Sequence, residues 1–394
     1  MFCLRCFKDN KMTLVILFIS TFLFCCQPKQ TNNHVITGAA QVDHYIPLLV
    51  GKNVALVANQ TSLVHQVHLV DTLLSRGINI SKVFAPEHGF RGEADAGASI
   101  DNTIDTKTGL PILSLYGKNK KPSKEFLEDV DMVVFDIQDV GARFYTYIST
   151  LHYVMEACAE NSIPVLVLDR PNPNAHYVDG PVLDTAFKSF VGIHPIPIVH
   201  GMTLAEYAQM INGENWLKDS VQCELYWQGM KNYDHQKSYN LPIKPSPNLP
   251  NSQSIALYPS LCLFEGTDMS VGRGTSQQFQ VIGSPKFDSC FYSFTPISRQ
   301  GAKYPKHENK DCCGWDLRDI EVQNQVDLKY LIKSYRQYEE KDSRFFNSFF
   351  DKLAGSSQLR IQIESGWTSD QIKQTWKDGL DAFKKKRQLY LIYP

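Results

Sequence analysis

The chain has 394 residues, of which 43% are hydrophobic and 21% are charged. This composition is ordinary for a globular protein and excludes a disordered or fibrous one. There are 40 lysines and arginines against 41 aspartates and glutamates, a formal net charge of −1, so we expect no general attraction to nucleic acid. At about 150 residues per domain, the length predicts two or three domains.

The N-terminal segment predicts an export signal. Arg5, Lys8 and Lys11 precede a mostly apolar run over 12–24. This run is shorter than the roughly 20 residues that a transmembrane helix needs. Residues 23–26, Leu-Phe-Cys-Cys, resemble a bacterial lipobox in which Cys26 is lipidated; a plain secretory signal is the alternative. We interpret 1–26 as a signal peptide with a lipobox, and we expect an extracytoplasmic, membrane-anchored lipoprotein in the periplasm or at the cell surface.

Six cysteines follow Cys26 in the chain, and their spacing does not fix a pairing. A bridge from Cys312 or Cys313 to Cys290 is one candidate. Cys158 falls inside a helical pattern, so we expect it to be a buried free thiol.

From residue 52 onward, short apolar runs alternate with helical patterns. The predicted strands cover 54–58, 80–84, 112–115, 132–135 and 165–168. Helices are predicted over 69–74, after an N-cap at Ser123, and along an apolar stripe from Tyr147 to Cys158. Buried strands that alternate with helices indicate a mostly parallel sheet covered on both faces. The fold class is therefore α/β, with a Rossmann-like catalytic domain at 38–245.

The texture of the sequence changes from about residue 244. The proline-rich segment 245–250 marks the change, either as a linker or as a loop at the rim of a site. The part that follows contains an apolar-alternating stretch over 359–363. A helix is predicted with Ile372, Trp376, Leu380 and Phe383 on one face, and a final strand is predicted over 389–393.

Polar residues stand directly after the predicted strands. They include Asn59, Glu87, His88, Tyr116, Asp136, Asp139, Asp169 and Arg170. Ligands of open α/β sheets bind outside the carboxyl ends of the strands, so we expect a site at this rim. Asp and Asn are also common in turns and caps, which gives each position a structural alternative.

Familiar nucleotide and hydrolase motifs are missing from the sequence. There is no G-x-G-x-x-G after the first strand, no Walker A loop, no H-E-x-x-H and no G-x-S-x-G. We therefore expect no cofactor, and an esterase or amidase is disfavoured. A metal site built on His88, Asp136 and His200 is an alternative, but these residues lack ligand spacing, so no metal is predicted.

Glu87 is the leading candidate for a general acid. It stands between Pro86 and Gly89 after a predicted strand, and partial desolvation there would favour its protonated form. Capping a turn or pairing with Arg91 is the structural alternative. Glycoside hydrolysis commonly uses two carboxyl groups. The candidates for the second are Glu93, Asp95, Asp136, Asp139 and Glu265.

Arginines next to aromatic residues suit an anionic sugar. Arg143 precedes Tyr145 and Tyr147, and Arg273 is flanked by glycines. As alternatives, Tyr147 would face the core and Arg143 would pair with Asp139. The other candidate substrate-binding residues are Asn59, His88, Asp169, Arg170 and His200.

Taken together, these stretches resemble the exo-β-N-acetylmuramidase family called NamZ, formerly a domain of unknown function. The matching blocks cover 57–61, 85–92, 135–148, 168–173, 197–202, 245–248 and 264–275. Asp268 and Val271 stand where the family block has Asn and Glu, which argues against a catalytic carboxylate at position 271.

The resemblance implies a second, smaller α/β domain at 246–394, which closes a cleft that holds the site. It also implies release of N-acetylmuramic acid from the non-reducing end of peptidoglycan fragments, by cleavage of its β-1,4 bond to N-acetylglucosamine, with Glu87 as the catalytic acid. The expected partners are muropeptides or glycan fragments. The alternative is a lipoprotein that binds muropeptides without cleaving them.

Overall fold

The computed structural model describes residues 34–394 except 88, 92–102, 118, 288–289 and 339–344. Residues 35–394 form one compact unit. We call 35–245 the N-terminal half of this unit and 246–394 the C-terminal half.

A seven-stranded sheet organises the N-terminal half, with the strand order β5-β6-β4-β1-β7-β8-β9. All neighbours are parallel except β5 and β6. The strands are β1 (Asn53–Ala58), β4 (Asn79–Ala85), β5 (Thr103–Ile104), β6 (Pro111–Ser114), β7 (Met132–Asp136), β8 (Val165–Leu168) and β9 (Leu225–Gln228). The chain builds outward from β1 to β6, then returns to the other side of β1 at β7. This is the Rossmann-like order, so the predicted fold is confirmed.

Helices cover both faces of this sheet. They are α1 (Val42–Leu49), α2 (Leu69–Ser75), α3 (Lys124–Leu127), α4 (Tyr147–Glu160) and α5 (Leu204–Gly213), and a small hairpin of β2 (Leu63–Val64) and β3 (Val67–His68) precedes α2. Alternate strand residues enter two separate cores: Val57 packs with α4 and α5, whereas Leu56 packs with α1 and α2. Burial on both faces explains why these strands are continuously apolar in the sequence.

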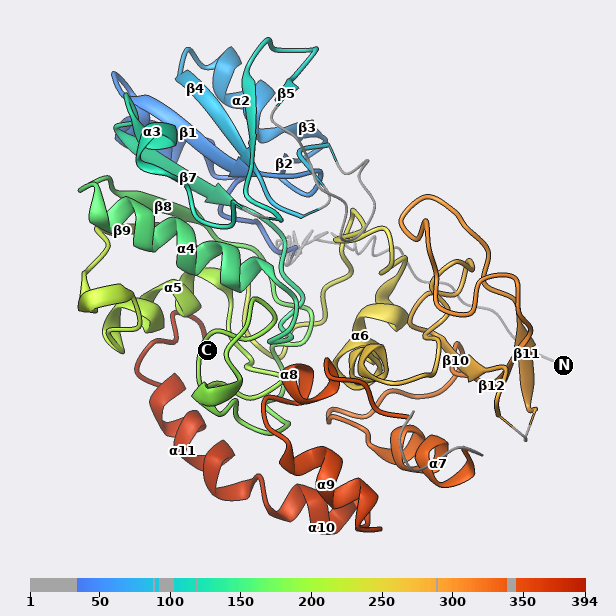
Figure 1. Cartoon of the computed structure of the whole chain (residues 1–394). Helices are drawn as coiled ribbons and strands as arrows, with labels where there is room; N and C mark the ends of the chain where they lie inside the picture. The colour runs from blue at the N-terminus through green and yellow to red at the C-terminus, as the bar shows by residue number, and fades with distance from the viewer. Residues whose placement is uncertain (1–33, 88, 92–102, 118, 288–289, 339–344) are drawn as a thin grey trace, which may run out of the picture. The chain divides into compact units, whose positions relative to one another are not determined.

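The C-terminal half combines helices with a three-stranded antiparallel sheet. Its elements are α6 (Ser252–Leu261), the 3₁₀ helix η3 (Cys262–Gly266), β10 (Val281–Ser284), β11 (Tyr292–Phe294), β12 (Cys312–Asp316), α7 (Lys329–Gln337), α8 (Phe350–Ala354), α9 (Gln358–Glu364), α10 (Ser369–Gln374) and α11 (Lys377–Arg387). The core around α4 continues through η3 and α8, so the two halves share one apolar cluster. Figure 1 shows α11 returning toward α5, where Arg387 donates to the carbonyl oxygen of Gly201.

The predicted strands and helices of the N-terminal half are confirmed, including the N-cap at Ser123, which accepts from Phe126 N. Three expectations for the C-terminal half differ from the structure. The stretch 359–363 is helical, and the single helix expected after it is divided into α10 and α11.

The predicted final strand over 389–393 is wrong, because this segment forms no ladder. Side chains of the N-terminal half fasten it instead. Ile392 N and Tyr393 N donate to Oε1 of Glu206, at 2.9 Å and 3.3 Å. Apolar residues in an extended run can thus be buried without strand pairing.

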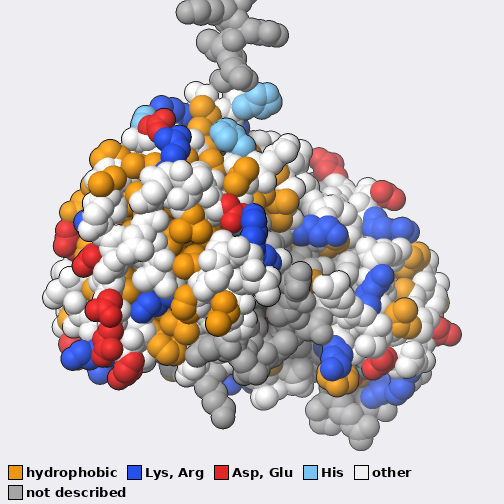
Figure 2. Space-filling model, turned by 90° about the horizontal axis from the view of Figure 1, so that it is seen from above, with side chains coloured by type: hydrophobic (Ala, Val, Ile, Leu, Met, Phe, Trp, Pro, Cys, Tyr) orange, Lys and Arg blue, Asp and Glu red, His pale blue; other side chains and the backbone are white. Residues whose placement is uncertain are grey.

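Cys290 and Cys313 form a disulfide, which is the pairing that the sequence suggested for one of the adjacent cysteines. Cys158 is buried and free, as expected. Among the residues that the structure describes, no helix is long and apolar enough to cross a membrane. On the face shown in Figure 2, acidic and basic side chains are interspersed, in keeping with the net charge of −1.

Candidate active site

Glu87 is presented by a tight turn directly after β4. Gly89 N donates to the carbonyl oxygen of Pro86 at 3.1 Å, and Gly89 has a φ of 77°. The Glu87 side chain is half-buried. Its Oε2 accepts a hydrogen bond from Oγ1 of Thr146, at the start of α4, at 3.1 Å. The turn after β4 and the N-terminus of α4 therefore fix the position of this carboxyl group together.

Tyr116, which follows β6, lines both cavities together with Glu87. Burial, and then the charge of Glu87, raise the pKa of the Tyr116 hydroxyl, so it remains protonated. Thr146 therefore orients the Glu87 carboxyl group, and Tyr116 adds a protonated hydroxyl to the same part of the site.

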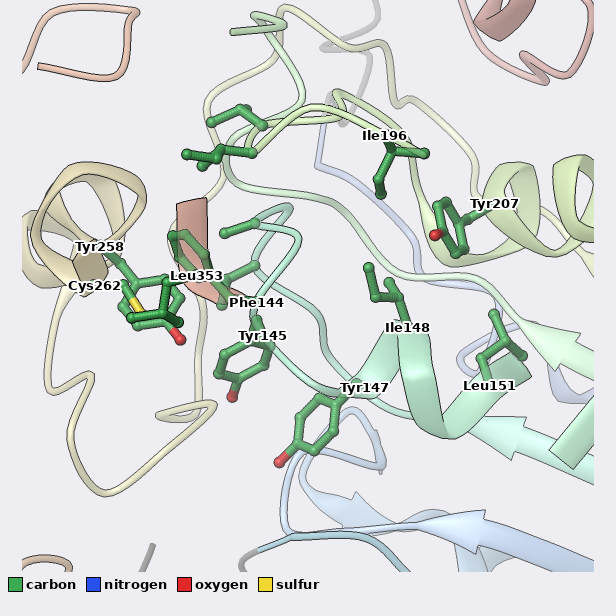
Figure 3. Close-up of a cluster of buried hydrophobic side chains, with 14 of the residues drawn as sticks. Phe144, Tyr145, Tyr147, Ile148, Leu151, Ile196, Tyr207, Tyr258, Cys262 and Leu353 are labelled. Atoms are coloured by element: carbon green, nitrogen blue, oxygen red, sulfur yellow. The ribbon is translucent and has the colours of Figure 1, made fainter. Parts of the chain in front are cut away.

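Glu87 lines a cavity of about 460 Å³ between the two halves, which we call the inner cavity. Its walls are mostly aromatic and aliphatic, and Glu87 and Glu265 are the carboxylates among its described lining residues. The lining includes Tyr116, Lys120, Phe144, Tyr145, Thr146, Tyr147, Phe190, Asn248, Tyr258, Cys262, Arg273, Phe279, Phe349 and Leu353. Figure 3 shows part of this wall, where Phe144 and Leu353 lie against Tyr258 and Cys262. An apolar cavity with few converging polar groups is the usual form of a small-molecule site.

A second cavity of about 600 Å³, the outer cavity, meets the inner one at Glu87. The two share Glu87, Tyr116, Glu265 and Arg273. The outer cavity is further lined by the segment 301–306, on which Tyr304 is 82% exposed. A bound chain could therefore extend from one cavity into the other across the pair of glutamates.

Glu265 and Arg273 form an ion pair at this junction, with Arg273 Nε 2.9 Å from Glu265 Oε1. Burial disfavours the charged guanidinium, but the Glu265 carboxylate outweighs this effect, and the pKa of Arg273 is raised. The Arg273 guanidinium carbon also lies 5.1 Å from the centre of the Phe279 ring. The positive charge of Arg273 is therefore already paired with Glu265 and is not free to bind an anionic ligand.

The glycines on either side of Arg273 are required by close packing. Both have positive φ angles, 75° for Gly272 and 82° for Gly274. A Cβ at Gly272 would lie 2.6 Å from Val281, and one at Gly274 would lie 2.7 Å from Pro305. The Gly-Arg-Gly pattern thus brings Arg273 close to the segment that lines the outer cavity.

Tyr145 and Tyr147 join the aromatic wall to the proline-rich segment. Tyr145 donates to the carbonyl oxygen of Pro245 at 2.8 Å, and the Tyr147 hydroxyl accepts from Asn59 Nδ2 at 2.9 Å. Figure 3 shows both hydroxyls pointing to the same side. Asn59 is fully buried and does not line either cavity, so it acts on the wall only through Tyr147.

Asp136 and Arg170, two predicted site residues, form a buried pair away from both cavities. Arg170 Nε is 2.5 Å from Oδ1 of Asp136, and Nη2 is 2.8 Å from Oδ2. Asp136 has no exposed surface. This bidentate pair ties β7 to the loop after β8, a structural use of charge.

Asp139 and His200 are also buried and do not line either cavity. Burial raises the pKa of Asp139 to about 7 and lowers the pKa of His200 to about 3. Asp139 Oδ2 accepts from Gly141 N at 2.6 Å. His200 is thus neutral near pH 7, and it is held within the fold rather than offered to a ligand.

Asp169 directly follows β8, and its fully buried side chain lies against the start of α5. It accepts from the Tyr393 hydroxyl at 2.7 Å and from Ala205 N at 3.1 Å. Burial raises the pKa of Asp169 to about 7. Its contacts join β8 to the C-terminal segment, so the structure does not bring it to the cavities.

Arg143 does not pair with Asp139 and does not reach a cavity. It has no exposed surface and donates to four carbonyl oxygens, those of Pro181, Ile196, Leu353 and Ala354, at 2.7 to 2.9 Å. Burial lowers the pKa of its guanidinium to about 9. Arg143 thus joins α8 to the N-terminal half and positions Leu353, a residue of the cavity wall.

Of the predicted site residues, the structure brings Glu87, Tyr145, Glu265 and Arg273 to the inner cavity. His88, Glu93, Asp95 and Cys26 lie outside the described residues. Sequence reasoning missed Thr146, Lys120 and Phe190 as lining residues. Lys120 stands in a lysine-rich stretch that is typical of solvated surface, and Phe190 lies in a segment with no periodic pattern.

A third cavity, about 800 Å³, is a groove lined by residues such as Gln60, Lys244, Ser246, Gln278 and Arg299, and it adjoins the inner cavity at Ser246. Its described lining contains no carboxylate. The inner and outer cavities, by contrast, share two carboxylates, Glu87 and Glu265.

Comparison with known proteins identifies the family of this chain. The model described as exo-β-N-acetylmuramidase NamZ, N-terminal, matches residues 54–253, and the corresponding C-terminal model matches 256–393. The chain belongs to the NamZ family of exo-β-N-acetylmuramidases. The resemblance seen in the sequence motifs is therefore confirmed.

Individual relatives cover nearly the whole chain. It is 39% identical over 380 residues to the peptidoglycan β-N-acetylmuramidase NamZ of Bacillus subtilis (strain 168), with 89% of each protein aligned. Two crystal structures of DUF1343 family proteins from Bacteroides fragilis NCTC 9343 share the fold. They are 49% and 27% identical, with TM-scores of 0.85 and 0.78, and both cover 91% of this chain and 99% of the other.

Proposed function

We propose that this NamZ family member hydrolyses the β-1,4 bond between a terminal N-acetylmuramic acid and the next N-acetylglucosamine in peptidoglycan-derived glycans. One observation carries the proposal: Glu87 and Glu265 both stand where the inner and outer cavities meet. A glycosidic bond that crosses this junction has a carboxyl group available for each half of the reaction.

Glu87 is the proton donor in this mechanism. The hydroxyl of Thr146 orients its carboxyl group, and the turn after β4 and the start of α4 hold it in place. Transfer of its proton to the glycosidic oxygen releases the leaving sugar. Glu265, oriented by Arg273, is the second carboxylate. It stabilises the positive charge that develops at the anomeric carbon as the bond breaks, and a water molecule then adds to that carbon to complete the hydrolysis.

The inner cavity receives the terminal sugar, and the outer cavity receives the rest of the glycan. An exo-acting enzyme needs a site that accepts one unit and excludes more. The inner cavity has buried aromatic walls from both halves, whereas the outer one opens at the exposed Tyr304. The wider opening therefore suits the continuing chain.

A synthetic disaccharide of N-acetylmuramic acid β-1,4-linked to N-acetylglucosamine tests the activity. Purified protein should release both monosaccharides, and Glu87→Gln should lower kcat at least about 100-fold, the lower end of general acid catalysis. Glu125→Gln, in the exposed first turn of α3, is the matched control and should keep full activity.

Calorimetry on the same disaccharide separates hydrolysis from capture. Binding by the wild-type protein without release of sugar would favour a muropeptide-binding lipoprotein. Near-normal turnover by a folded Glu87→Gln variant would instead move the proton donor to another residue. A melting temperature within a few degrees of wild type shows that this variant is folded.

We propose further that the mature protein is a lipoprotein anchored through Cys26 outside the cytoplasm. The support is the lipobox-like sequence at 23–26 and the disulfide between Cys290 and Cys313, because disulfides persist in oxidising compartments. Mass spectrometry of the N-terminal peptide from cell membranes should show a diacylglyceryl group on Cys26. A Cys26→Ala variant that still partitions with membranes would contradict the anchor.

A further inference from the structure

The cations around the two cavities differ in what they already contact. Arg273 is paired with Glu265. Lys306, in the outer cavity, donates to the carbonyl oxygens of Thr267 and Met269 within the chain. Both positive charges therefore already contact groups of the protein, and an anionic ligand would have to break one of these contacts to bind Arg273 or Lys306.

Lys120 is different from these cations. Its Nζ lies 4.6 Å from the centre of the Phe190 ring, and both side chains line the inner cavity. Within the described part of the chain, Lys120 makes no ion pair with a carboxylate. Its neighbour Lys121, by contrast, lies 2.7 Å from both Glu156 and Glu160.

Phe190 is itself held by aromatic neighbours. The Tyr153 ring stacks on it at a centroid distance of 6.2 Å, and the Tyr116 ring approaches edge-on at 6.4 Å. The ring thus supports the Lys120 ammonium while leaving its N–H donors available. A cation over a partly exposed ring is stabilised less than one that makes a charge-assisted hydrogen bond to a carboxylate.

We propose that Lys120 binds the lactyl carboxylate of the terminal N-acetylmuramic acid and thereby sets the preference for this sugar over N-acetylglucosamine. The inference rests on the proposed function, because it needs the terminal sugar in the inner cavity. The lactyl ether is the group that distinguishes the two amino sugars, and its carboxylate is the charge that Lys120 can pair with. Phe190 then borders the same side of the bound ring.

Two chromogenic substrates isolate this contact. The first is the 4-nitrophenyl β-glycoside of N-acetylmuramic acid, called the acid, and the second is the same glycoside with its lactyl carboxyl group converted to the methyl ester, called the ester. The wild-type protein should prefer the acid. In Lys120→Met, kcat/KM for the acid should fall about 10- to 100-fold, mainly through KM, the loss expected for one charged hydrogen bond. The ester should change less than about threefold, and Lys120→Arg should keep the preference for the acid.

Two control variants complete the experiment. Lys121→Met removes the adjacent charge outside the cavity, and Lys303→Met removes a charge from the outer cavity; both should leave the acid-to-ester ratio unchanged. An unchanged ratio in Lys120→Met, or an equal loss on both substrates, would overturn the role of Lys120. If the wild-type protein hydrolyses neither glycoside nor the disaccharide, the proposed function fails instead.

Discussion

Three aspartates and one glutamate lie at or after the carboxyl ends of strands in the same sheet, yet the surroundings of the aspartates differ from those of the glutamate. Asp136, Asp139 and Asp169 are buried, and each accepts at least one hydrogen bond from the protein. Glu87 is half-buried and, with Glu265, lines two cavities. In the sequence, the three aspartates and Glu87 all look like polar residues at a strand end.

The difference teaches that the place of a residue after a strand does not decide its role. The carboxyl ends of β7 and β8 are covered by the rest of the protein, so charges there are paired or become neutral. The strand β4 ends beside the opening between the halves. A carboxyl group at that point keeps surface that a substrate can reach.

The largest effect on folding is expected from Asp136→Asn. The substitution leaves the buried guanidinium of Arg170 without its counter-charge, and breaking a buried pair in this way costs about 3–5 kcal/mol. Denaturant unfolding should show this loss of unfolding free energy. Turnover per folded molecule should stay near that of the wild-type protein, because the pair lies away from the cavities.

Asp43→Asn is the matched control for this experiment. Asp43 pairs with Arg76 at 3.0 Å, but its side chain is 80% exposed. Exposed pairs contribute about 0–1 kcal/mol, so stability should change little. If Asp136→Asn instead kept wild-type stability and lost turnover, Asp136 would belong to the catalytic machinery.

A somewhat smaller loss is expected from Arg143→Met, which removes a donor from four buried carbonyl oxygens, although that of Ile196 still accepts from Leu183 N at 3.1 Å. Unsatisfied buried groups cost about 1–3 kcal/mol each and do not add fully, so we expect a loss of about 2–4 kcal/mol on denaturant unfolding. Because Leu353 lines the inner cavity, KM for the disaccharide should also rise, with little change in kcat.

The acid and ester glycosides show whether Arg143 has a direct role in binding. A positioning residue affects both substrates alike, whereas a residue that contacts the lactyl carboxylate affects the acid alone. A selective loss on the acid in Arg143→Met would therefore show that Arg143 contacts the substrate, contrary to its four contacts with backbone carbonyls.

Most of the N-terminal half could be predicted from sequence, because buried parallel strands are continuously apolar and helices repeat at their own period. The C-terminal half was less predictable. Over 359–363 the alternating pattern is short enough to suit more than one structure, and only the packing of Leu359 and Ile363 in the core decides for a helix. The final segment is fixed by Glu206, which lies far away in sequence.

For the site, the local motif around Glu87 was sufficient, since Pro86 and Gly89 indicate a turn directly after a strand. The companions of Glu87 were not visible in the same way. Thr146 and Lys120 reach the cavity only because α4 and the loop after β6 meet there in three dimensions. Arg143 looked like an anion binder because sequence shows its charge but not the four carbonyls around it.

Of the substitutions Asp136→Asn, Arg143→Met and Asp139→Asn, the last should lower the free energy of unfolding least at pH 5. At this pH Asp139 is protonated, so replacing it with Asn removes no charge. Burial raises the pKa of Asp139 to about 7, whereas an exposed Asp titrates near 4. Between these values, the folded state holds a proton that the unfolded state has released. The contribution of this group to stability therefore falls as pH rises from about 4 to 7 and is constant above.

The melting temperature of Asp139→Asn relative to wild type should accordingly rise from pH 5 to pH 8. Asp169, whose pKa is also raised to about 7, and His200, whose pKa is lowered to about 3, are present in both proteins. Their own effects on stability therefore cancel in this difference. If the pH profile of stability were unchanged but turnover were lost at every pH, Asp139 would act with Glu87 in the reaction, and the division between buried and cavity carboxylates would fail.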